Sequence, residues 1–226
     1  METNELIEVI KNAQRYLIGI GEDVSDDPKI QDEIYLGLSE FLEDKDFFIV
    51  TMKTDDRIYR YFPGKEDRIS SPMGNRRYIQ CPDGCDEALY EVTEVTNEGI
   101  THYNKECSLV TEMEPKCPTC GKTMVYNNFL APVFLGEGCA KDWDHYNEWL
   151  TRTLNRKLII LELESGMLNP KLIRWPFEKV AMLNEKAVFV RVHSSLNMLP
   201  KELSSKAVAV KSDSLSFLQK HLIGIF

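Results

Sequence analysis

The sequence predicts an α/β protein with a doubly wound, mostly parallel sheet and an inserted cysteine-bearing module. Segments with helical periodicity alternate with continuous apolar runs of strand length, which is typical of parallel strands covered by helices on both faces. From Cys81 to about Phe134 this alternation stops, and Thr-, Glu- and Asn-rich sequence with two cysteine pairs replaces it. We therefore expect a sheet domain made of residues 1–80 and 135–226, with residues 81–134 as the insert.

The first part of the chain predicts two helix-strand units. Apolar residues at helical spacing indicate a helix over residues 4–17, and Tyr16–Ile20 is a short apolar segment that leads into glycines. Asp27-Pro28 supplies a cap and a first turn for a second helix, whose apolar face runs over residues 30–42. Phe47–Thr51 is a continuous apolar run, so we expect a strand that lies centrally in the sheet.

The same alternation resumes after the insert. Its predicted elements are a helix over 141–156, a strand over Lys157–Leu163, a helix over 175–185, strands over Ala187–Val192 and Ala207–Val210, and a last helix over Ser212–Leu222 capped by Ser212 or Asp213. Open parallel sheets of this kind bind ligands at the carboxyl ends of their strands.

Composition narrows the possible functions. A formal net charge of -9 repels polyanions, so we expect no nucleic-acid partner. No apolar run approaches the roughly 20 residues that span a bilayer, and the N-terminus lacks a basic and an apolar signal region. These features predict a cytoplasmic protein with no membrane partner.

The cysteines give the strongest local signal. In a reducing compartment metal binding outranks disulfides. Cys81 and Cys85 form one pair and Cys117 and Cys120 another, each with a turn-forming Pro or Gly between or beside the thiols. We predict that these four thiolates bind one zinc ion in a zinc ribbon. With all four positions filled by protein, the ion would be structural and would have no site for a reacting water.

Three alternatives to this ligand set stay open. The irregular first pair and the long stretch between pairs leave Cys107 as an alternative ligand, and the role of Cys139 is undecided. The cysteines could also be unpaired reduced thiols, or they could bind an iron–sulfur cluster.

A zinc ribbon inserted in a Rossmann-like sheet resembles the sirtuins, a family of NAD-dependent protein deacylases. Six segments resemble landmarks of that family in the same order, among them its glycine turn, its Thr-Gln-Asn-x-Asp strand end, its His-Gly and its Gly-Thr-Ser. They are Ala13–Gly21, Phe48–Asp55, Arg68–Gly74, Val133–Glu137, Ile160–Ser165 with Pro170, and Lys206–Asp213. The resemblance implies an NAD site that includes Gly19, Gly21, Thr51, Asp55 and Ser165.

Several positions depart from the family pattern. Met73 stands where the family has its histidine base, and a thioether cannot accept that proton. Lys53 replaces the family's asparagine, and Leu163-Glu164 replaces its Gly-Thr, which would put a carboxylate where a phosphate or ribose must approach the backbone. These departures argue against NAD binding and leave the catalytic residues unassigned.

Negative charge around the glycine turn also argues against NAD binding. Glu22, Asp23 and the Asp26-Asp27 pair follow Gly21 closely, and the family's cofactor loop is missing there. Gly19 and Gly21 then have a simpler interpretation as glycines of a strand-to-loop turn.

Two other groups are candidates for a catalytic role. Asp55 and Asp56 are better explained as caps of a helix over Arg57–Phe62 than as paired catalytic carboxylates. His193 is the one histidine at the carboxyl end of a predicted sheet strand, and a solvated or capping role is the simpler assignment for it.

The sequence therefore favours a catalytically impaired, sirtuin-like binding module with a protein partner or a nucleotide or small-molecule ligand. The alternative is an NAD-dependent deacylase or ADP-ribosyl-transferring enzyme with a rearranged active site. A third hypothesis is a binder of a small molecule other than NAD near Gly19, Thr51 and Ser165.

Overall fold

A computed structural model describes residues 3–92, 100–103, 109–111 and 115–223 of the chain. It divides into two compact units, which we call the sheet unit and the cysteine unit. The sheet unit comprises Met1–Met52, Arg57–Ser70 and Asp144–Phe226, and the cysteine unit comprises Lys53–Asp56 and Ser71–Trp143. Among the helices of the described residues, none is long and apolar enough to cross a bilayer.

The sheet unit contains six strands that pair in parallel throughout, in the order β11-β10-β9-β1-β2-β3. These strands are β1 Arg15–Ile20, β2 Asp46–Thr51, β3 Ile69–Ser70, β9 Leu158–Leu163, β10 Ala187–Val192 and β11 Ala207–Val210. The predicted Rossmann-like α/β class is confirmed.

The strand order reverses between β1 and β9. From β1 the chain steps outward to β2 and β3, and after the cysteine unit it returns to β9 on the other side of β1 and steps outward to β10 and β11. Open α/β sheets bind ligands outside the carboxyl ends of their strands at such a switch point. In this chain that position lies just after Ile20 and Leu163.

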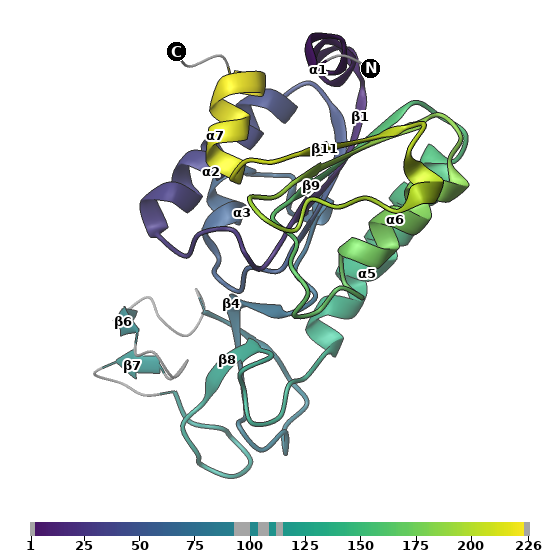
Figure 1. Cartoon of the computed structure of the whole chain (residues 1–226). Coiled ribbons are helices and arrows are strands. Elements are labelled where there is room, and N and C mark those ends of the chain that lie inside the picture. The colour runs from purple at the N-terminus through teal and green to yellow at the C-terminus, as the bar shows by residue number, and fades with distance from the viewer. Residues whose placement is uncertain (1–2, 93–99, 104–108, 112–114, 224–226) are drawn as a thin grey trace. The chain divides into compact units, whose positions relative to one another are not determined.

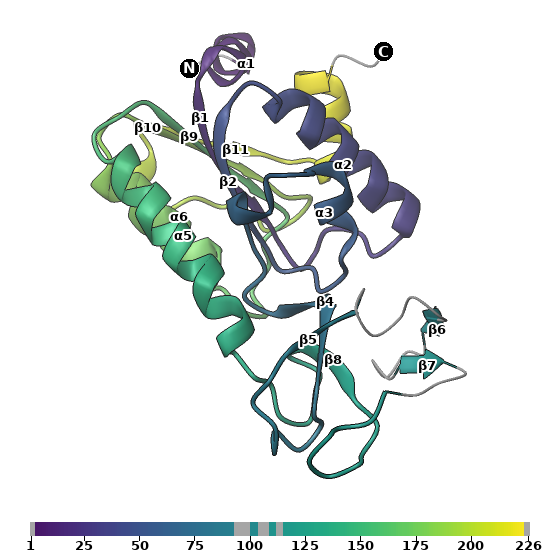
Figure 2. The same cartoon turned by 180° about the vertical axis from the view of Figure 1, so that it is seen from behind.

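Helices cover both faces of the sheet, with α5 and α6 along one face and α2 and α7 on the other (Figures 1 and 2). The helices of the described residues are α1 Thr3–Asn12, α2 Pro28–Leu42, α3 Arg57–Tyr61, α5 Glu137–Thr153, α6 Arg174–Leu183 and α7 Ser214–Leu218, with short 3-10 helices η1 Glu66–Arg68 and η2 Lys201–Leu203 and a π-helix η3 Gln219–Ile223. This arrangement explains why the strands are apolar on both faces.

Alternate residues of each strand supply two separate cores. On the α2 side Tyr16, Ile18 and Ile49 pack in one large apolar cluster. On the α5 side the Phe48 ring lies 5.3 Å from the Tyr146 ring and 5.9 Å from that of Trp149.

A buried ion-pair network joins β9 and β10, which sequence analysis did not predict. The Arg191 guanidinium donates to both carboxylate oxygens of Glu162, at 2.6 and 2.9 Å, and to Glu178 on α6 at 2.7 Å. Arg191 also donates to the Met198 carbonyl, and Arg174 donates to the Leu196 carbonyl. These two arginines therefore fix the loop that follows β10.

Three boundary predictions need correction. The first helix ends at Asn12 and not at residue 17, and α5 begins at Glu137, four residues before its predicted start. The predicted last helix is split into α7 and η3, and Asp213 is its cap because the side chain accepts from the Ser216 amide at 2.9 Å. The predicted strand Phe47–Thr51 is β2, an internal strand that pairs with β1 on one side and with the short edge strand β3 on the other.

The cysteine unit is built on small antiparallel sheets. β4 Gly74–Gln80 lies between β5 Tyr90–Glu91 and β8 Val125–Asn128, and β6 Ile100–Tyr103 pairs with β7 Leu109–Thr111. Its buried cluster contains Ile79, Met124 and Tyr126 together with Cys81 and Cys117. Such a core is too small to stabilise the unit without another contribution.

Candidate metal centre and sheet switch point

Two tight turns present the four cysteines. The first follows β4, where the Gly84 amide donates to the Cys81 carbonyl at 3.2 Å. In the second, the Gly121 amide donates to the Cys117 carbonyl at 2.8 Å. Both glycines have positive φ, 65° and 71°, which residues with a side chain rarely adopt. Glycine at these positions lets each turn direct two thiols to the same side.

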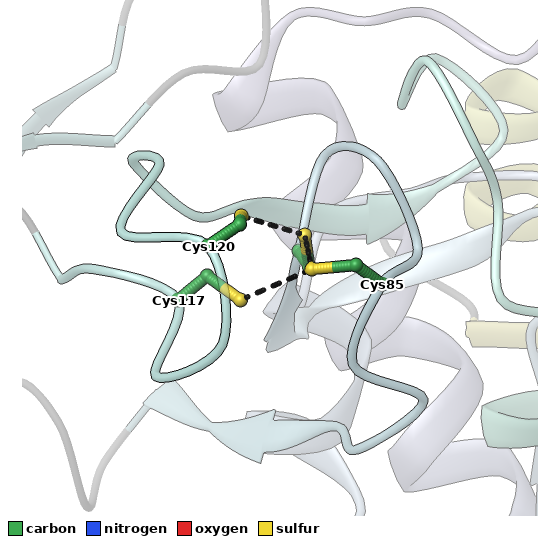
Figure 3. A group of neighbouring side chains, drawn as sticks. Cys85, Cys117 and Cys120 are labelled. Atoms are coloured by element: carbon green, nitrogen blue, oxygen red, sulfur yellow. Dashed lines mark hydrogen bonds between the residues drawn. The ribbon is translucent and has the colours of Figure 1, made fainter.

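The four sulfur atoms meet at one point. Cys81 Sγ lies 3.3 Å from Cys85 Sγ and 3.7 Å from Cys120 Sγ, and Cys85 Sγ lies 3.6 Å from Cys117 Sγ (Figure 3). All four lie within 4.8 Å of one another. Four sulfurs bound tetrahedrally to one zinc at 2.3 Å would be about 3.8 Å apart. The cluster therefore fits a zinc ion of four-thiolate coordination.

The thiols also interact electrostatically as a group. Burial opposes ionisation of Cys81, but hydrogen bonds from the Asp83 backbone and from Cys85 outweigh it and lower the pKa of Cys81 to about 6. Hydrogen bonds with the Cys81 and Cys120 thiols raise the pKa of Cys85. Ionising one thiol thus disfavours ionising its neighbours. A bound cation would offset the repulsion between the thiolates and allow all four to ionise.

Cys139 lies outside this cluster. It is buried, its thiol donates to the Ser71 carbonyl at 3.3 Å, and burial raises the pKa of Cys139 to about 11. Such a thiol is neutral and is a poor metal ligand. Cys107, the alternative ligand, lies outside the described residues.

At the switch point the backbone stays paired beyond the ends of β1 and β9. The Gly21 amide donates to the Leu163 carbonyl at 2.8 Å, and the Asp23 amide donates to the Glu164 carbonyl at 3.1 Å. A Cβ on Gly21 would lie 2.2 Å from the Glu164 carbonyl oxygen and 2.2 Å from Ser165 Cα. We call this contact the Gly21 seam. The space that a glycine opens for a phosphate in dinucleotide-binding turns is filled here by the chain's own backbone.

The other predicted cofactor residues lie in β1, at the ends of β2 and β9, and in the cysteine unit. Gly19 lies within β1, and a Cβ there would meet Ile173 at 2.6 Å and Phe177 at 2.7 Å, so it faces the α6 layer. Thr51 is the buried last residue of β2. Ser165 is buried after β9, and its carbonyl accepts from Arg174 at 2.8 Å. Asp55 belongs to the cysteine unit.

The Glu164 carboxylate binds the start of α7. The side chain accepts from the Ser214 amide at 2.9 Å and from the Ser214 hydroxyl at 2.7 Å, at the start of α7. Its backbone adopts φ 45°, an uncommon conformation for a residue with a side chain. Glu164 therefore positions α7 and shapes the loop of the Gly21 seam.

The acidic residues after Gly21 have local partners. Glu22 accepts from the Leu168 amide at 3.0 Å, and Asp27 caps α2 by accepting from the Lys29 amide at 2.8 Å. Asp23 Oδ2 lies 3.1 Å from Nε2 of His193. These carboxylates hold loops together, although their charge still disfavours a phosphate nearby.

His193 has a capping role and is buried, so its predicted solvated alternative is wrong. Its Nδ1 accepts from the amides of Ser195 and Leu196, both at 3.1 Å, so Nε2 carries the proton and donates to Asp23. Both ring nitrogens of His193 are therefore hydrogen-bonded within the protein. Met73 and Lys53 are also buried and belong to the cysteine unit, where the Met73 carbonyl accepts from the Phe129 amide at 2.9 Å.

Comparison with known proteins gives two matches, and no family model matches the chain. A protein ADP-ribosyltransferase of Staphylococcus aureus is 22% identical over 184 residues, which cover 79% of this chain and 57% of that protein. The chain is thus distantly similar to protein ADP-ribosyltransferases. A "probable bifunctional ADP-ribose hydrolase/ADP-ribosyltransferase" of Fusarium oxysporum f. sp. cubense is 28% identical over 136 residues, covering 54% of this chain and 21% of that protein. The chain therefore spans little more than half the length of one match and a fifth of the other.

Proposed function

We propose that this chain is a sirtuin-like protein that transfers ADP-ribosyl groups from NAD. The observation that carries the proposal is the similarity to a protein ADP-ribosyltransferase over 79% of the chain. The sheet order supports it, because its reversal between β1 and β9 gives the topology in which open α/β sheets bind dinucleotides.

In this proposal zinc is structural. The four cysteines Cys81, Cys85, Cys117 and Cys120 would fill every coordination position, so the ion would stabilise the cysteine unit and take no part in the reaction. NAD would lie at the carboxyl edge of the sheet. Gly21, Thr51 and Ser165 are the predicted cofactor residues at the ends of β1, β2 and β9, where NAD would contact them.

A second candidate function is that of a binding module without catalysis. Three observations favour it: Met73 is at the position of the family's base, Lys53 is at that of its asparagine, and the Gly21 seam fills the turn. A protein of this kind would bind a protein partner or a small ligand and would release no nicotinamide.

Nicotinamide release distinguishes the two candidates. Purified, zinc-loaded protein incubated with NAD, alone and with an acetyl-lysine peptide, is expected to release nicotinamide above a protein-free blank. Release without peptide indicates ADP-ribosyl transfer or NAD hydrolysis, and release that requires peptide indicates deacylation. Absence of both release and NAD binding by calorimetry would refute the enzyme proposal in favour of the binding module.

A matched pair of variants tests where NAD binds. Thr51→Val keeps the shape of a buried residue at the end of β2 and removes its hydroxyl. We expect it to weaken NAD binding about ten- to a hundredfold, because one hydrogen bond to a charged ligand contributes roughly 1.5 to 3 kcal/mol. Thr153→Val makes the same change at the end of α5, where the hydroxyl donates to the Leu150 carbonyl, and should leave NAD binding unchanged. Equal effects of the two variants would argue against a site at Thr51.

A further inference from the structure

A hollow of about 760 Å³ lies at the amino-terminal edge of the sheet. It has no part in the proposed zinc site or the proposed NAD site. Three backbone segments line it at the starts of β1, β9 and β10, namely residues 12–15, residues 154–157 and Lys186. All of them belong to the sheet unit. Its volume is within the range of about 300 to 1,000 Å³ that is typical of small-molecule sites.

The lining is strongly basic in a chain that is acidic as a whole. Arg15, Arg156, Lys157 and Lys186 line the hollow, and among the described residues no carboxylate does, although the chain has a formal net charge of -9. Arg15 pairs with Asp46, with 3.3 Å between Nε and Oδ2. Within the described part of the chain, the side chains of the other three cations form no ion pair.

Helix dipoles account for only part of this charge. α1 ends at Asn12, α5 ends at Thr153 and α6 ends at Leu183, so the carboxyl ends of three helices lie near the hollow. Each end carries about half a negative charge, and cations there are expected to stabilise the helices. Together with Asp46 the three ends offset about two and a half of the four positive charges. An excess of roughly one to two positive charges remains, which suits one phosphate group.

A buried amide fixes the segments that carry these cations. The Asn184 side chain donates to the carbonyls of Thr153 and Arg156, both at 3.1 Å, and accepts from the Lys186 amide at 3.1 Å. Asn184 is 2% exposed. It therefore joins the connection between α5 and β9 to that between α6 and β10, and it fixes the backbone at Arg156 and Lys186 before any ligand arrives.

We propose that this basic hollow is a binding site for a small phosphorylated molecule, recognised through its phosphate groups. The Arg156 guanidinium offers a planar pair of donors suited to phosphate oxygens, and Lys157 and Lys186 supply mobile point charges. The site lies at the opposite end of the strands from the switch point, so it is separate from the proposed NAD site.

Pyrophosphate and ADP are the probes for a calorimetric titration of the zinc-loaded full chain at low ionic strength. We expect the triple variant Arg156→Gln, Lys157→Gln, Lys186→Gln to raise the Kd of both probes at least about tenfold. The matched control Lys179→Gln, Lys201→Gln, Lys211→Gln removes the same charge from exposed positions elsewhere in the sheet unit, and it should change either Kd less than about twofold. Equal Kd values for pyrophosphate and ADP would show that the phosphates alone are recognised, and a lower Kd for ADP would add the nucleoside to the ligand.

Two results would overturn this proposal. One is unchanged binding by the triple variant, which would place the anion elsewhere, including at the switch point. The other is an equal loss of affinity in the control triple variant, which would show that the effect comes from the net charge of the protein and not from this hollow. If both triple variants have the melting temperature of the wild type, the six substitutions leave the fold intact.

Discussion

Removal of the metal is expected to unfold the cysteine unit while the sheet unit keeps its structure. Among the described residues, the apolar cluster beside the cysteines has three buried members besides cysteine, Ile79, Met124 and Tyr126, so most of the unit's stability must come from elsewhere. Structural zinc contributes apparent binding free energies of roughly 10 to 16 kcal/mol in zinc-finger peptides. The same outcome is expected for Cys117→Ser. We expect wild-type protein to contain one zinc per chain and proteolysis within residues 71–143 to accelerate about a hundredfold or more when the metal is lost.

Two cysteine variants serve as controls for this experiment. Cys139→Ala changes a buried thiol outside the cluster and should retain the full zinc content. Cys107→Ser should also retain it if the four clustered thiols complete the site. A zinc content of Cys117→Ser equal to that of the wild type would show that the cluster does not bind the metal.

Alanine at Gly21 is expected to destabilise the sheet unit severely. Its Cβ would lie 2.2 Å from both the Glu164 carbonyl oxygen and Ser165 Cα, and backbone atoms cannot move aside as a flexible side chain can. To accommodate the methyl group, the hydrogen bonds from the Gly21 and Asp23 amides to β9 and its following loop must break. We expect a loss of at least about 3 kcal/mol, which lowers the melting temperature by roughly 6 to 12 °C in a chain of this size.

Gly64→Ala is the matched control for that variant. Gly64 has a φ of 73°, and nothing lies within 4 Å of the added Cβ, so only the backbone conformation opposes the substitution. That cost is about 1 kcal/mol, or roughly 2 to 4 °C. Melting followed by circular dichroism would compare the two variants. If Gly21→Ala were as mild as Gly64→Ala, the backbone contact of the Gly21 seam would be disproved.

Apolar runs of strand length predicted two strands of the parallel sheet well. The runs Ala187–Val192 and Ala207–Val210 match β10 and β11 residue for residue. β4 escaped prediction because its sequence, Gly-Asn-Arg-Arg-Tyr-Ile-Gln, has no apolar alternation and is stabilised by pairing with β5 and β8. The π-helical end of the last helix likewise has no sequence signal.

The candidate sites were predictable to different degrees. The two cysteines of each pair are close together in the sequence. The convergence of Cys81, Cys85, Cys117 and Cys120 therefore follows from two short turns. The Gly21 seam joins residues more than 140 positions apart, and the Glu164 carboxylate finds its partner 50 positions away at Ser214. Those contacts depend on how the strands are ordered in the sheet, and residue spacing does not encode that order.

The Gly21 seam sets a condition on any cofactor that enters the switch point. The amides of Gly21 and Asp23 donate to carbonyls as strand amides do, so their protons should exchange with solvent far more slowly than those of an ordinary loop. If a dinucleotide can bind only after the Gly21 turn separates from the loop that follows β9, it binds only the fraction of molecules in which that turn is already open. Were that fraction about one in a hundred, the apparent dissociation constant would rise about a hundredfold, and a partner that held the turn apart would restore it.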